Sequence, residues 1–162
     1  MISLSDEFSN GITMLNKEND VSVRCGGQQA LLNDAMQVRV QVFVQEQGVP
    51  PEVEADDYDA VSVHVVVYSQ QGKPVATGRL LPDGHIGRMA VLAGYRGQGL
   101  GALVLSHLLQ HAQQRGQQHL QLSAQRHAKG FYERFGFVVQ GHEYLDVGIP
   151  HVDMVLSLQE LM

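Results

Sequence analysis

With 162 residues, of which 44% are hydrophobic and 17% charged, the chain suits one globular domain with a single core and is too short for two ordinary domains. Its formal net charge of −6 argues against general binding to nucleic acids or anionic membranes, because those surfaces attract clustered Lys and Arg. A cationic or neutral partner fits this charge better.

Residues 1–20 are expected to form an N-terminal extension ahead of a single domain over residues 21–162. The start of the chain carries two acids and no Lys or Arg before an apolar run, which differs from the layout of a signal peptide. No uninterrupted apolar stretch reaches the roughly 18 to 20 residues that a membrane helix requires. We therefore expect a cytoplasmic protein that does not enter a membrane.

The domain begins with a predicted strand, Val21–Cys25, followed by a segment that fits two patterns, Gln28–Gln45. Helical spacing places four of its apolar residues on one face: Leu31, Ala35, Val38 and Val42. Its second half also alternates with the period of a strand, and its β-branched residues favour a strand: Val38, Val40, Val42 and Val44. The local pattern leaves both structures open. Cys25, the single cysteine, is interpreted as a buried structural thiol.

After an acidic loop, Glu52–Asp59, the strands Val61–Ser69 and Pro74–Leu81 flank a turn and predict an antiparallel hairpin. Apolar spacing indicates a helix over Gly99–Gln114, with Gly116 as a natural stop. The other expected elements are the strands Ile86–Val91, His119–Ala124, Phe137–Tyr144 and Val152–Leu158 and a short helix, Ala128–Phe135. Together they indicate an α+β fold with a central mixed, mostly antiparallel sheet flanked by helices.

The glycine-rich segment Arg96–Ala102 lies between a strand and the clearest helix. Its three glycines bring backbone N–H groups together at a helix N-terminus, where an anion is favoured, and Arg96 adds a full positive charge for a diphosphate. No Gly-Lys-Ser/Thr follows, which excludes a Walker motif. The segment meets a relaxed dinucleotide fingerprint, but no acidic residue follows about 20 positions on, which disfavours a nicotinamide or flavin cofactor.

Two runs resemble the acetyl-CoA-binding strand and the pyrophosphate loop of the GCN5-related N-acetyltransferase (GNAT) superfamily: Gly87-Arg88-Met89-Ala90-Val91 and Tyr95-Arg96-Gly97-Gln98-Gly99-Leu100-Gly101. Three further segments, residues 42–48, 131–137 and 148–151, resemble its ElaA-like and YjcF-like branch. The resemblance spans the chain from about Val21 to Leu158 and assigns the ambiguous Gln28–Gln45 segment to a helix.

The resemblance implies acetyl-CoA as co-substrate, bound where the strand that contains residues 89–91 splays away from its neighbour. The N–H groups of Met89 and Val91 would then hold the pantetheine carbonyls or stabilise the oxyanion of the reaction. The implied cofactor-binding residues are Met89, Ala90, Val91, Arg96, Gly97, Gln98, Gly99, Leu100, Gly101, Gln125, Phe131 and Tyr132.

The resemblance also implies two catalytic side chains. His151 would accept a proton from the amine, and Tyr132 would donate one to the departing thiolate of CoA. Other bases stay open: Glu46, Glu143 or a chain of waters. A structural reading makes His151 a turn residue and places Tyr132 in an aromatic core patch with Phe131, Phe135 and Phe137.

The candidate substrate-binding residues are Glu46, Glu54, Asp56 and Arg79. The acidic segment could steer a cationic amine by its field, although a solvated loop is the commoner explanation. Positions that match anion-binding arginines of relatives hold Val44, Gly87 and Gln125, which disfavours a phosphonate substrate, while the arginines at 79, 88 and 126 leave a carboxylate open. No metal is expected, because His107 and His111 have chelating spacing but lack further ligands.

We therefore expect an N-acetyltransferase in which a primary amine of a small molecule or peptide attacks acetyl-CoA directly in a ternary complex, without a covalent acetyl-enzyme. The alternative is a non-catalytic module of the same fold that binds acyl-CoA as a sensor or structural ligand. Family members often pair, so a homodimer stays open.

Overall fold

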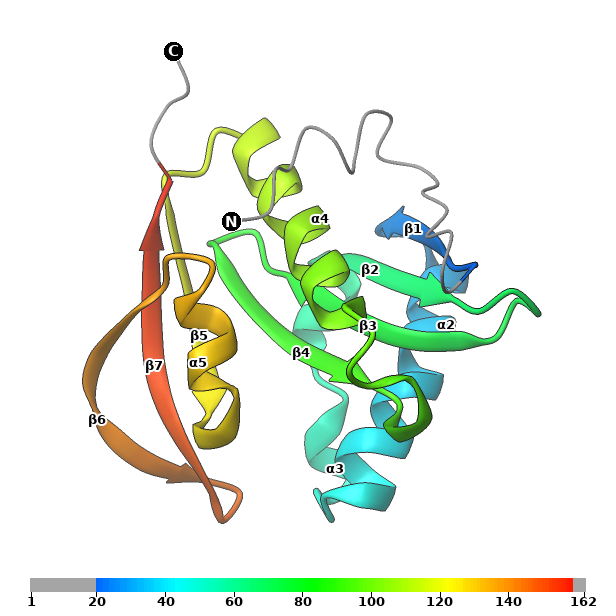
Figure 1. Cartoon of the computed structure of the whole chain (residues 1–162), viewed down its shortest axis with the longest axis horizontal. Coiled ribbons are helices and arrows are strands. Elements are labelled where there is room, and N and C mark those ends of the chain that lie inside the picture. Colours follow the sequence, from blue (N-terminus) through cyan, green and yellow to red (C-terminus); the bar gives the residue numbers. More distant parts are fainter. Residues whose placement is uncertain (1–19, 159–162) are drawn as a thin grey trace.

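The computed structural model describes residues 20–158, in which helices cover a seven-stranded mixed sheet (Figure 1). The strand order is β1-β2-β3-β4-β5-β7-β6, and only the β4–β5 pair is parallel. The strands are β1 (Ser22–Gly26), β2 (Val63–Tyr68), β3 (Pro74–Leu80), β4 (His85–Val91), β5 (His119–Gln125), β6 (Val138–Asp146) and β7 (Ile149–Ser157). The expected α+β fold with a mostly antiparallel sheet is confirmed.

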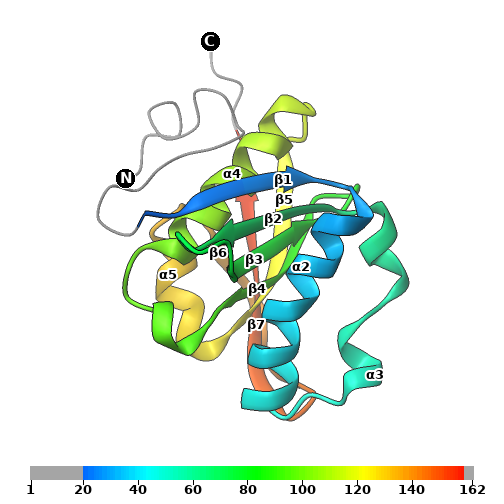
Figure 2. The ribbon, with the colours of Figure 1, turned by 90° about the vertical axis from the view of Figure 1, so that its right-hand side faces the viewer.

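Helices lie on both faces of the sheet. Figure 2 shows α2 (Gln29–Arg39) on one side and α4 (Leu100–Gln114) and α5 (Lys129–Glu133) on the other. Side chains alternate along β3, so Arg79 contacts residues on the α2 side while Gly78 faces α4. A Cβ at Gly78 would lie 2.7 Å from Cγ1 of Val104, so the missing side chain lets α4 pack closely against the sheet.

The segment that fits two patterns is helical throughout. Helix α2 continues into a π-helix, η1 (Val40–Glu46), in which wider turns form hydrogen bonds such as Gln47 N–H to the carbonyl of Val42. The predicted apolar stripe is buried against the sheet: Leu31, Ala35, Val38 and Val42. The strand alternative is therefore wrong, because burial of this stripe outweighs the β preference of the valines.

The remaining elements agree with the sequence to within a few residues, apart from the acidic segment. The β2–β3 hairpin closes through the Ser69 N–H, which donates to the carbonyl of Lys73. The segment expected as an acidic loop contains two short helices, α3 (Pro51–Glu54) and η2 (Asp57–Val61), so that expectation is wrong. Asp56 caps η2 by accepting a hydrogen bond from the Tyr58 N–H.

Cys25 lies half-buried on β1, and burial raises the pKa of its thiol to about 12, which fits a structural role. Across residues 20–158, no helix is long and apolar enough to cross a membrane. Nearly all of the expected N-terminal extension lies outside the described residues, so the domain boundary at residues 20 and 21 stays a prediction.

Candidate functional site

The centre of the sheet is open on one side of β4. Strands β4 and β5 pair only at His85 with Gln121 and at Ile86 with Leu122. Beyond these pairs β4 stays with β3 while β5 follows β7, so within the described chain residues 87–91 have no β5 partner (Figure 1). Residues 89–91 therefore lie on a strand edge that has no β5 partner, although β3 pairs with Ala90 and Val91 on the other side. Their role in binding acetyl-CoA stays a prediction.

A bulge shapes this edge. Between the pairs Thr77 with Ala90 and Arg79 with Gly87, β4 has two residues where β3 has one. One of them, Arg88, has a left-handed backbone with φ of 50°, which is uncommon for a residue with a side chain. A bulge bends its strand, and this one lies where β4 leaves β5.

The glycine loop follows β4 and leads into α4. Gly97 and Gly99 have φ of 78° and 82°, and an added Cβ at either would meet no atom within 4 Å. Exposed Gln98 lies between them, and Leu100 buries its side chain at the start of α4. Open space, glycine backbone and the N-terminus of a 15-residue helix fit a diphosphate. A Cβ at Gly101 would lie 3.5 Å from Cζ of Phe131, which places α5 beside the loop.

Arg96 connects this loop to the end of η1. Its Nε donates to the carbonyl of Val91 at 2.9 Å, and its Nη1 and Nη2 donate to the two carboxylate oxygens of Glu46 at 2.7 Å each. The hydrogen bond from Arg96 lowers the pKa of Glu46. The structure thus pairs a residue predicted to bind the cofactor with one predicted to bind the substrate, and makes Glu46 a weaker base.

His151 lies on β7 between Gln125 of β5 and Tyr144 of β6. Its imidazole is 8% exposed, and Nδ1 lies 2.7 Å from the carbonyl of Ile149. A carbonyl only accepts, so Nδ1 carries a proton, and in the neutral imidazole the lone pair is therefore on Nε2. An imidazole in this tautomer can act as a base.

A pair of amides lies next to His151. The Gln125 amide donates to Oε1 of Gln47 at 2.8 Å, and Gln47 donates back to Oε1 of Gln125 at 3.2 Å. This pair links the end of η1 to β5 at the edge where β4 and β5 separate. Sequence reasoning missed Gln47, whose one signal was its place beside Glu46 in the segment that resembles the family.

Tyr132 lies in α5 within an aromatic cluster. Its ring centroid is 5.1 Å from that of Phe131 and 5.9 Å from that of Phe137, and Phe135 packs on Phe131. Tyr132 thus lies in the aromatic core patch with Phe131, Phe135 and Phe137, and its catalytic role stays a prediction. Burial raises the pKa of Tyr132, which keeps its hydroxyl protonated at neutral pH.

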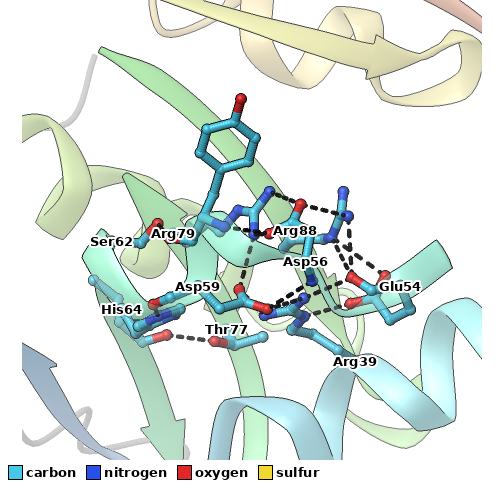
Figure 3. Close-up of polar contacts among 11 residues, drawn as sticks. Arg39, Glu54, Asp56, Asp59, Ser62, His64, Thr77, Arg79 and Arg88 are labelled. Carbon is cyan, nitrogen blue, oxygen red and sulfur yellow. Dashed lines mark hydrogen bonds and ion pairs between the residues drawn. The ribbon is translucent and has the colours of Figure 1, made fainter. Parts of the chain in front are cut away.

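The other predicted substrate residues belong to a buried ion-pair network between α2 and the sheet (Figure 3). Arg39 of α2 donates to the carboxylate of Glu54 and, through Nη1, to Asp59 at 2.7 Å. Arg79 of β3 binds Asp56 at 2.7 Å and Asp59 at 2.8 Å. These carboxylates are therefore paired with arginines; Glu54 and Asp59 are buried, and Asp56 stays partly exposed.

Arg88 joins the network from the bulge of β4. Its Nε and Nη2 donate to the carbonyl of Glu54 at 3.1 and 3.0 Å, and Nη2 lies 3.3 Å from Asp56 (Figure 3). Three arginines thus face three carboxylates within the network, while Glu52 and Asp57 of the acidic segment stay exposed. Although burial opposes it, hydrogen bonds from Arg39 and Arg79 hold the pKa of Asp59 at about 2.

His107 of α4 is buried and has a packing role. Nδ1 of His107 donates to the carbonyl of Leu103 at 3.0 Å, and burial lowers the His107 pKa to about 4. Among residues 20–158, no group of three or more His, Cys, Asp or Glu side chains is placed to hold a metal ion.

Known proteins are similar to this chain in sequence and in fold. A family model described as "Acetyltransferase (GNAT) domain" matches residues 31–158. The Uncharacterized N-acetyltransferase YjcF of Bacillus subtilis (strain 168) is 41% identical over 128 residues, covering 76% of this chain and 91% of that protein.

Solved structures agree with the sequence matches. An acyl-CoA N-acyltransferase from Pseudomonas aeruginosa superposes with a TM-score of 0.75 and 33% identity, covering 83% of this chain and 98% of that chain. ElaA from Escherichia coli superposes with a TM-score of 0.75 and 27% identity, over the same shares of the two chains. The chain therefore belongs to the GNAT acetyltransferase family, in its ElaA-like and YjcF-like branch.

Proposed function

We propose that the protein transfers the acetyl group of acetyl-CoA to a primary amine of a small molecule or peptide by direct attack in a ternary complex. One observation carries this proposal: the edge of β4 that has no β5 partner leads through a short 3-10 helix, η3 (Ala93–Tyr95), into the open glycine loop at the N-terminus of α4. This combination offers backbone donors to a pantetheine arm and an anion site to its diphosphate.

In this mechanism the backbone N–H groups of Met89 and Val91 stabilise the negative charge that develops on the thioester oxygen. The amine nitrogen forms a bond to the carbonyl carbon, and Nε2 of His151 accepts the proton that the amine loses. When the C–S bond breaks, Oη of Tyr132 donates a proton to the thiolate. Arg96, Gly97 and Gly99 hold the diphosphate.

Calorimetric titration tests the first step. We expect the purified protein to bind acetyl-CoA in the micromolar range and to bind NADH and ATP far more weakly. Arg96→Glu should abolish the binding, because it places a negative charge beside the diphosphate and next to Glu46. Equal binding of NADH, or no binding of acetyl-CoA, would contradict the proposal.

The ion pair of Arg96 with Glu46 supplies a matched control. The double variant Glu46→Arg with Arg96→Glu restores a pair of opposite charges but moves the cation away from the loop. If residue 96 contacts the diphosphate, the double variant should stay deficient. Recovery of binding would show that the pair only maintains the loop.

Turnover is tested next by the release of the CoA thiol with a panel of amines. We expect His151→Ala to lower kcat/KM by about a hundredfold or more, the usual contribution of a general base, and Tyr132→Phe to lower kcat. Binding of acetyl-CoA without thiol release, unaffected by either variant, would instead favour an acyl-CoA-binding module.

A further inference from the structure

Tyr144 of β6 lies beside His151 and has no part in the mechanism above. The two residues face each other across the β6–β7 pair, their ring centroids are 6.2 Å apart, and the ring planes are inclined by only 24°. Tyr144 is 39% exposed, whereas His151 is 8% exposed. The phenol ring therefore lies beside the buried imidazole and nearly parallel to it.

A bulge places Tyr144 at this position. Gln140 pairs with Asp153 and Tyr144 pairs with His151, so three β6 residues, 141–143, stand opposite Val152 alone. Gly141 adopts a φ of 84°, which accommodates the extra chain. Without these extra residues a different side chain of β6 would lie across from His151.

The phenol is fixed at its far end by two further strands. Oη of Tyr144 donates to the carboxylate of Asp153 on β7 at 2.6 Å and contacts Oγ of Ser123 on β5. An ionised carboxylate only accepts, so the single phenol proton goes to Asp153 and the Ser123 hydroxyl donates to Tyr144. Burial and the hydrogen bond to Asp153 raise the pKa of Tyr144, which keeps the phenol protonated at neutral pH.

We propose that Tyr144 is a positioning residue that holds the imidazole of His151 with Nδ1 on the carbonyl of Ile149 and with Nε2 free to accept a proton. The backbone bond at Nδ1 fixes one point of the imidazole, and the anchored ring limits its rotation. The charged groups on the neighbouring elements include Asp153 on β7, Glu143 and Asp146 on β6, and Arg126 on η4 (Arg126–Ala128). Arg126 and Glu143 neutralise each other in an ion pair. The catalytic consequence of this proposal rests on the proposed function of His151.

Nuclear magnetic resonance tests the positioning directly, without any amine substrate. Nitrogen-15 spectra report the tautomer of each imidazole, and His151→Gln identifies the His151 signals. We expect the Nδ1–H tautomer of His151 in the wild type and a mixture of tautomers in Tyr144→Leu. Tyr144→Phe keeps the aromatic ring but loses its hydrogen bond to Asp153, so its tautomer population should lie between those of the wild type and Tyr144→Leu. Leu145→Thr, at an exposed neighbour on the same strand, should match the wild type. An unchanged tautomer in Tyr144→Leu would overturn the proposal.

A double-mutant cycle tests the consequence for catalysis. We expect Tyr144→Leu to lower kcat about tenfold with little change in the KM for acetyl-CoA, because a misplaced base slows proton transfer. In the His151→Ala background the same change should have no further effect, whereas an equal loss there would contradict positioning. If Tyr144→Leu fails to fold, Asp153→Asn can take its place in the cycle, because it weakens the hydrogen bond that holds Tyr144 and keeps the phenol ring. If the wild type transfers no acetyl group to any amine, the proposed function fails, while the tautomer measurement still decides on the positioning.

Discussion

Arg39 is the residue on which the buried network depends most. Its side chain is 1% exposed, and it reaches both Glu54 and Asp59. We expect Arg39→Met to lower the free energy of unfolding by roughly 3 to 5 kcal/mol, because two buried carboxylates lose a cation and keep one arginine each, Arg88 for Glu54 and Arg79 for Asp59. Urea denaturation at neutral pH measures this change.

A surface arginine provides the control for that measurement. Arg126 forms an ion pair with Glu143 in solvent, and Arg126→Met should leave the urea midpoint unchanged within error. If Arg39→Met were as mild as Arg126→Met, the ion pairs of Arg39 would make no measurable contribution to stability.

The same network shows which contacts of these residues the sequence could not predict, while their role in substrate binding stays a prediction. Composition and motif placed Glu54, Asp56 and Arg79 among substrate-binding candidates, but their partners lie 15 to 34 residues away in the chain. The sequence carries no local signal for such pairing, because it arises when α2, α3 and β3 pack together. The glycine loop was easier to predict, since Gly97 and Gly99 have positive φ values that glycine tolerates best.

At the scale of elements, the spacing between α4 and the sheet depends on Gly78. We expect Gly78→Ala to lower the free energy of unfolding by about 1 to 3 kcal/mol, because its Cβ would press on the stiff Val104 and push α4 outward. Affinity for acetyl-CoA should fall as well, since α4 carries the glycine loop. Thermal unfolding and calorimetry measure the two effects.

Gly94→Ala is the matched control for this change, because a Cβ there would meet nothing within 4 Å and its φ is not positive. Equal stability of the Gly78 and Gly94 variants would mean that α4 adjusts without cost, and that its distance from β3 does not set the position of the loop.

Elements with a strong periodic signal were predictable, and those defined by packing were not. The apolar spacing of α4 and the turn of the β2–β3 hairpin gave elements that end within about two residues of those observed. The spacing of apolar residues did not indicate the π-helix after α2 or the bulge at Arg88, because each depends on a single backbone irregularity. The resemblance to GNAT proteins, and not periodicity, identified the splayed strand.

For the whole molecule, buried histidines should make stability depend on pH. Burial lowers the pKa of His107 from 6.5 to about 4 and also lowers the pKa of His64 and His111. Between pH 6.5 and 4 the unfolded chain therefore binds protons that the folded chain does not, so the free energy of unfolding rises with pH in this window. The stabilisation is fully present above pH 6.5 and is lost as the pH falls.

We expect His107 alone to account for a loss of roughly 2 kcal/mol in the free energy of unfolding between pH 7 and pH 5. Urea denaturation at the two pH values measures this loss, and His107→Leu should remove most of it while His119→Leu, at an exposed position, should not. The further fall of the free energy of unfolding below pH 4 should persist in both variants, because it comes from carboxylates such as Asp59, whose pKa is held at about 2. A His107→Leu variant that kept the full dependence between pH 7 and pH 5 would show that this histidine takes up its proton in the folded protein as readily as in the unfolded chain.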